Sequence, residues 1–143
     1  MKRLLGVLLL AGAVLAVAAD DKKEDAAKAE LKKLEGTWLL VSAEENGQKA
    51  PDNGVKIKAV VKGDKLTIYF GDQKLEGTIS VDPSKKPKEI DTVTTADKKK
   101  SLAIYELNGD TLKICGGKGE RPKEFKADKG SNCALYVYKR EKK

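Results

Sequence analysis

Acid–base and nucleophilic chemistry has few candidate residues in this sequence, because it contains no histidine. Without imidazole there is no Ser-His-Asp or Cys-His nucleophile and no HExxH zinc site. Carboxylates could still act as acids or bases, but those such as Asp64, Asp97 and Asp110 lie in turn sequences or beside lysines. We therefore expect no catalytic residues and a protein that is not an enzyme.

Basic side chains gather in two segments that could bind an anion. One is Lys98, Lys99 and Lys100, and the other is "CGGKGERPK", which contains Lys118, Arg121 and Lys123. The second segment has neither a P-loop nor a G-x-G-x-x-G pattern, and no predicted helix follows it, so a phosphate loop is disfavoured. Solvated loop charge is the alternative for all six side chains, which are our candidate ligand-binding residues.

The first nineteen residues have the features of a cleaved signal peptide. A basic start, Met1-Lys2-Arg3, precedes an apolar stretch that ends in small residues at Ala16 to Ala19. The alternative is an uncleaved anchor, but a helix over Leu4 to Ala19 would span only about 24 Å of a hydrocarbon core about 30 Å thick. We expect residues 1–19 to be removed. The chain would then be periplasmic or extracellular, with no stable membrane anchor.

Two cysteines, Cys115 and Cys133, are predicted to form a disulfide, because an exported chain with no C-x-x-C motif usually pairs its thiols. Antiparallel pairing of the flanking strands would bring them close, and the bond would add about 3 kcal/mol in the chain-entropy model. Two buried thiols that lie too far apart to bond are the alternative. A metal site made from two thiolates alone is disfavoured, so we expect no metal.

Hydrophobic periodicity divides the rest of the chain into a helix and a series of strands. Residues 20–30 form a charged linker, frayed over 20–25, and the start of a short helix that Gly36 ends; residues 31–143 form the folded domain. From Gly36 onward the period is two, with regular turn signals. The predicted strands are Thr37–Glu44, Val55–Val61, Leu66–Phe70, Lys74–Val81, Glu89–Thr95, Leu102–Leu107, Thr111–Cys115 and Ala134–Arg140.

Short turns and the lack of a crossover helix predict that these strands form a closed, eight-stranded, antiparallel up-and-down barrel, an all-β fold. Alternation points large residues such as Ile57, Ile68 and Ile79 inward, and among the assigned positions only Ala59 and Gly77 are small. We therefore expect a mostly packed core. In the first and last strands both faces are apolar, so Leu135 and Val137 cannot be distinguished from Tyr136 and Tyr138 as the inward residues.

The segment Gly36-Thr37-Trp38, at the head of the first strand, resembles the G-x-W signature of lipocalins. The resemblance implies that the helix closes one end of the barrel and that Trp38 plugs it. It also implies that a basic residue late in the last strand packs over the ring; Arg140 matches that place, and Lys139 is equally close in sequence. Longer strings, "ELKKLEGTWLLVSAEENGQK", "VDPSKKPKEID" and "AIYELNGDTLKICGGKGERPKEF", resemble an uncharacterised lipocalin-like domain family typical of planctomycete bacteria. That family implies the fold, with no activity or cofactor, and Cys133 departs from its pattern.

Strand directions place the loops 45–54, 71–73, 96–101 and 116–133 at the end opposite the helix. We therefore expect an exported interaction module that docks an unknown protein or an acidic envelope polymer through these basic loops. The alternative is a carrier or sensor of a small apolar ligand, and an empty interior would favour it. Nucleic acid is disfavoured as a partner by the export signal and by an aromatic content of 5%.

Overall fold

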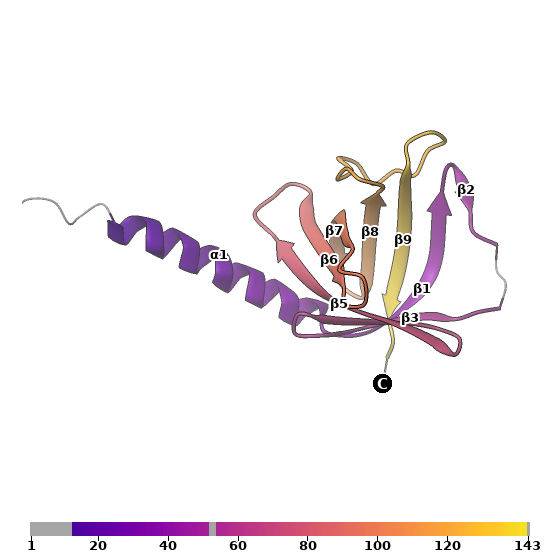
Figure 1. Cartoon of the computed structure of the whole chain (residues 1–143), viewed down its shortest axis with the longest axis horizontal. Coiled ribbons are helices and arrows are strands. Elements are labelled where there is room, and N and C mark those ends of the chain that lie inside the picture. The colour runs from indigo at the N-terminus through magenta and orange to yellow at the C-terminus, as the bar shows by residue number, and fades with distance from the viewer. Residues whose placement is uncertain (1–12, 52–53, 143) are drawn as a thin grey trace, which may run out of the picture.

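A closed antiparallel β-barrel with a helix projecting from one end forms the computed structural model of the chain (Figure 1). The structure describes the backbone of residues 13–51 and 54–142, and the side chains of 21–51 and 54–142. Most of the predicted signal peptide, residues 1–19, lies outside the described residues.

One helix and nine strands are described. They are α1 Ala13–Leu34, β1 Gly36–Glu45, β2 Gln48–Lys49, β3 Ile57–Lys62, β4 Lys65–Phe70, β5 Gln73–Asp82, β6 Lys88–Thr94, β7 Lys100–Asn108, β8 Thr111–Gly117 and β9 Cys133–Arg140. Each strand from β3 to β8 pairs with the next in sequence, and β1 pairs with both β3 and β9, which closes an eight-stranded barrel. The predicted fold is therefore confirmed. Strand β2, which pairs only with the end of β1, was not predicted.

Helix α1 continues through residues 20–25, which we had expected to be a frayed linker. The segment has no glycine or proline, and Glu24 and Lys28 form an ion pair of 3.2 Å one turn apart. Among the described residues, no helix is long and apolar enough to cross a membrane.

The C-terminal end of α1 closes the barrel around Trp38. This side chain is fully buried, and its indole Nε1 donates a hydrogen bond to the carbonyl oxygen of Leu34 at 2.8 Å. The Arg140 guanidinium lies 4.2 Å from the centre of the Trp38 ring and donates to the backbone oxygens of Lys33 and Glu35. Gly36 has a φ of 126°, and a Cβ there would lie 2.9 Å from Arg140 Nη1. The helix end, β1 and β9 are thus joined at one point.

A buried carboxylate, Glu30, also holds the helix on the barrel. Its Oε1 accepts hydrogen bonds from Lys88 Nζ at 2.8 Å and from the Tyr105 hydroxyl at 3.0 Å. Burial by itself would raise the pKa of Glu30, but these two bonds and the charges of Lys88 and Lys33 outweigh it and hold the pKa below its ordinary value. Sequence reasoning had assigned Glu30 only to a charged segment.

Residues 118–132, which we call the strap, fold back over the outer wall of the barrel. Ile104 of β7 and Cys115 of β8 alternate with inward-facing residues, so they point outward, and yet both are almost fully buried. The strap covers them: the Cys115 thiol contacts the Lys126 carbonyl oxygen at 3.5 Å, and Ala127 of the strap is itself buried. The strap therefore completes a small second core outside the barrel.

The disulfide prediction is wrong for this structure, in which Cys115 and Cys133 are free thiols. The two strands do pair as predicted, but Cys133 is opposite Gly117, and Cys115 is opposite Leu135. The cysteines are therefore diagonal neighbours in the sheet. Burial raises the pKa of the Cys115 thiol. Within the described residues, no group of three or more acidic, cysteine or histidine side chains is placed to hold a metal.

Candidate ligand-binding site in the barrel

The barrel interior contains a cavity of about 460 Å³. The expectation of a mostly packed core is therefore wrong. Small-molecule sites in proteins usually measure about 300–1,000 Å³, so this cavity is large enough for one ligand.

Small residues on the barrel wall leave this space empty. Ala103 of β7 and Gly116 of β8 are opposite each other in the sheet, and Ala59 of β3 and Gly77 of β5 also line the cavity. Gly77 is also required by the backbone, because a Cβ there would be only 2.6 Å from the Val93 carbonyl oxygen. Sequence reasoning found Ala59 and Gly77 but did not assign Ala103 and Gly116 to the interior.

The cavity changes in polarity from its base to its mouth. Leu34 and Trp38 form the base. The walls are mainly aliphatic and include Ala59, Val61, Leu66, Ile68, Ile79, Ile90, Leu112 and Ile114. Hydroxyl and charged groups also line the cavity, from Thr92, Thr94, Ser101, Glu45, Glu76, Lys99, Lys118 and Asn132. Most of these lie in the strand ends and turns at the open end. The site suits a molecule with an apolar body and a polar end.

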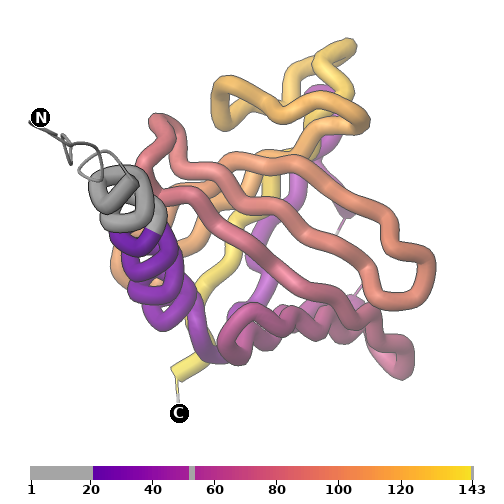
Figure 2. Tube along the Cα trace, turned by 60° about the vertical axis from the view of Figure 1, so that its left-hand side comes forward, coloured from indigo at the N-terminus to yellow at the C-terminus, as the bar shows by residue number. Residues whose placement is uncertain are grey.

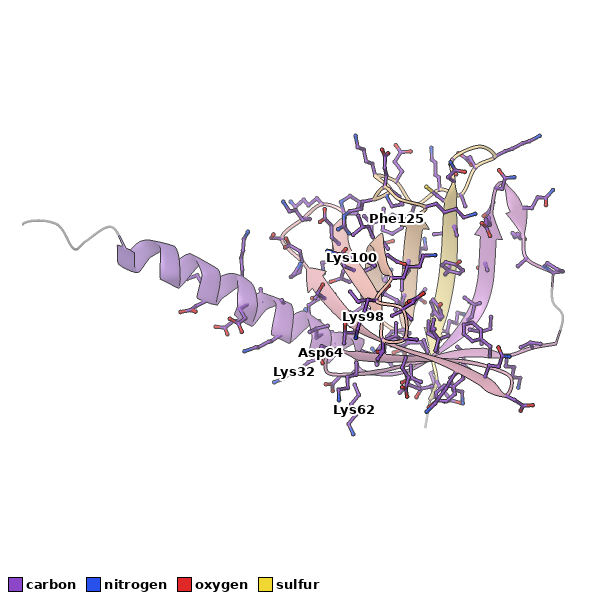
Figure 3. All side chains as sticks on the ribbon, viewed as in Figure 1. Lys32, Lys62, Asp64, Lys98, Lys100 and Phe125 are labelled. Carbon is purple, nitrogen blue, oxygen red and sulfur yellow. The ribbon has the colours of Figure 1, made fainter. Side chains whose placement is uncertain are left out.

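Of the six basic candidates, only Lys99 and Lys118 line the cavity. Lys118 is exposed and lies 3.4 Å from Glu45, whereas Lys99 has no ion-pair partner among the described residues. Lys98 lies in the β6–β7 turn, and Lys100 points to the outer face, 3.8 Å from Asp91 (Figure 3). Lys99 is thus the rim cation that is free to meet a ligand.

Arg121 and Lys123 belong to the strap and do not line the cavity. Arg121 Nη2 lies 2.7 Å from Asp91 Oδ1, and its Nη1 donates to the Ala103 carbonyl oxygen at 2.7 Å. This guanidinium is occupied in fixing the strap to β6 and β7. Lys123 is exposed on the strap.

Apolar side chains complete the mouth. Phe70 and Leu75, beside the β4–β5 turn, are 37% and 41% exposed, and Leu75 also lines the cavity. The β4–β5 and β6–β7 turns lie side by side at this end (Figure 2), where Thr95 N donates to the Glu76 carbonyl oxygen. Lys62 and Asp64 mark the opposite, closed end, where Gly63 N donates to Glu35 of the helix end (Figure 3). An apolar ligand would therefore meet hydrophobic surface at the entrance.

Comparisons with known proteins identify no relative of this chain. The chain matches no protein-family model, and neither the curated proteins nor the solved structures give a significant match.

Proposed function

We propose that this protein is a carrier or sensor that binds one small, largely apolar molecule inside its barrel. The observation that supports this most directly is the cavity of about 460 Å³, aliphatic along most of its walls. No cofactor is needed for such a function.

The polar end of the ligand would lie at the mouth. Lys99 is a rim cation without an ion-pair partner in the described part of the chain, and Thr94 and Ser101 offer hydroxyl groups in the cavity beside it. At the base, Leu34 and Trp38 offer mainly hydrophobic surface. The free-energy cost of placing a charged group is far smaller at the solvent-exposed rim than in the apolar base. An anionic group of the ligand would therefore point toward the mouth.

A module that docks a protein or an acidic envelope polymer ranks second. Its premise was a filled interior, which the barrel does not have. Its basic surface is also reduced, because Arg121 and Lys100 lie beside Asp91. The observation that favours a docking module is the exposure of two cations, Lys98 and Lys123.

We further propose that the chain is exported, is not an enzyme and belongs to the lipocalin-like family of planctomycetes that its sequence resembles. Export is supported by the basic and apolar segments of residues 1–19, and the absence of an enzymatic role by the lack of histidine. The family proposal is supported by the quoted sequence strings and by the Gly36, Trp38 and Arg140 arrangement.

Filling the cavity should abolish ligand binding. In Ala103→Phe, a ring replaces a methyl group on the inner wall, and we expect the affinity for cis-parinaric acid, a fluorescent polyene fatty acid, to fall more than about tenfold. Thr67→Phe adds the same ring on the outer face of β4 and should leave the affinity unchanged.

Lys99→Gln should weaken binding about two- to fivefold.

Fluorescence titration measures all three variants, and circular dichroism confirms that each is folded. Equal affinity of wild type, Ala103→Phe and Thr67→Phe would place the probe outside the barrel and contradict the proposal.

A further inference from the structure

Two tyrosines of β9 face the barrel interior. Both Tyr136 and Tyr138 line the cavity, and Tyr138 is only 9% exposed. Tyr138 is opposite Leu40 and Leu112, two positions along β9 from Arg140, so it lies in the layer directly above Trp38. Tyr136 lies one layer nearer the mouth, opposite Ala43 and Ile114.

The hydroxyl groups of this pair have no hydrogen-bond partner in the part of the chain that the structure describes, and neither oxygen is closed off from accessible space. Tyr105 is a contrasting case in the same barrel: it is 1% exposed, and its hydroxyl donates to Glu30 at 3.0 Å. Buried hydroxyl groups are nearly always paired, because an unmade bond there is costly. The hydroxyls of Tyr136 and Tyr138, by contrast, remain open to the cavity, where a bound molecule can supply a partner in place of water.

We propose that Tyr136 and Tyr138 form a hydrogen-bonding site for an uncharged oxygen acceptor, such as a ketone or other carbonyl group, within the apolar body of the ligand. This inference rests on the proposed function and narrows its ligand class. A carbonyl oxygen accepts hydrogen bonds through its two lone pairs, and a tyrosine hydroxyl group can donate one.

The acceptor must be uncharged because, among the described residues, no cation lines the inner part of the cavity. The two cations that line the cavity, Lys99 and Lys118, come from the β6–β7 turn and the start of the strap at the open end. Burying a carboxylate without a positive partner is far more costly than burying a carbonyl group. Burial raises the pKa of both phenols, that of Tyr138 to about 12, so both keep their protons and remain donors at neutral pH.

A matched pair of probes tests the site. Prodan is a dimethylaminonaphthalene with a propionyl group, and its propyl analogue has the same frame without the carbonyl group. In Tyr138→Phe, which removes only the hydroxyl, we expect the affinity for prodan to fall about tenfold and that for the propyl analogue to change less than about twofold. Tyr136→Phe should act in the same direction with a smaller effect, because this side chain is only partly buried.

Prodan also reports the hydrogen bond itself, because its emission shifts to the blue when its carbonyl loses a donor. We expect this shift in Tyr138→Phe and not in Tyr69→Phe, which removes a hydroxyl on the outer face of β4. An unchanged emission together with an equal loss of affinity for both probes would overturn the hydrogen-bonding site while leaving the cavity function intact. If neither probe binds the wild type, the proposed function fails and this inference fails with it.

Discussion

Replacing Trp38 with alanine is expected to lower the free energy of unfolding by about 3–5 kcal/mol, the usual cost of truncating a buried tryptophan. Its ring fills the base of the barrel, with no exposed surface. The substitution would also remove the hydrogen bond to Leu34 and the surface on which Arg140 lies. The helix end, β1 and β9 would then lose their common contact.

Urea denaturation followed by circular dichroism measures this loss, since the variant has no tryptophan fluorescence. The matched control is Tyr69→Ala, an aromatic truncation on the outer face of β4, which should cost less than about 1 kcal/mol. If Trp38→Ala costs no more than this control, the ring is not the plug of a closed barrel end.

Replacing Glu30 with alanine is expected to cost about 2–3 kcal/mol, because the buried hydroxyl of Tyr105 loses its acceptor. Lys88 is partly exposed and can turn toward water, which keeps the loss below that for a fully buried ion pair. Glu24→Ala is the control: it breaks an exposed pair on the same helix and should change stability by less than about 0.5 kcal/mol. Similar losses in both variants would show that Glu30 does not anchor the helix.

The stability that Glu30 contributes should depend on pH. The pKa of Glu30 is lower in the folded protein than its ordinary value of 4.5, so the folded state favours the ionised carboxylate. Its contribution is therefore fully present above pH 4.5 and is lost as the pH falls through the folded pKa. The difference between wild type and Glu30→Ala should shrink in acid, and a difference that grows as the pH falls would contradict this assignment.

The barrel could be predicted from the sequence because its pattern is local. In β3, β4 and β5, apolar residues such as Ala59, Ile68 and Ile79 alternate with polar ones, and this alternation determines which face is inward. In β9 both faces are apolar, so only the surroundings could show that Tyr136 and Tyr138 face the cavity. On the other face of β9, Leu135 lies opposite Cys115, whose outer side the strap covers.

The strap did leave a signal in the sequence. In β7, three consecutive residues, Ala103, Ile104 and Tyr105, are apolar or aromatic. A strand with one solvent-exposed face would instead alternate apolar and polar residues. The outward-facing Ile104 requires a cover, which the strap supplies. Arg121 could not be assigned to that cover from sequence, because its partners Asp91 and Ala103 are distant along the chain.

The cavity could not be predicted, because its volume depends on how far apart the walls are. Side-chain sizes alone suggested a filled interior. Four small wall residues, Ala59, Gly77, Ala103 and Gly116, are enough to open it once the barrel has closed at its observed width. Two of these four lie in β7 and β8, for which no inward face had been assigned.

Native mass spectrometry of the protein, purified gently from cells that naturally produce it, tests the cavity most directly. We expect the wild type to carry one small bound molecule in stoichiometric amount, and the Ala103→Phe variant, purified in the same way, to carry none. The mass of the released molecule would also show whether it contains oxygen in an otherwise apolar frame. A wild-type protein that is as free of ligand as the blocked variant would contradict a ligand-binding barrel.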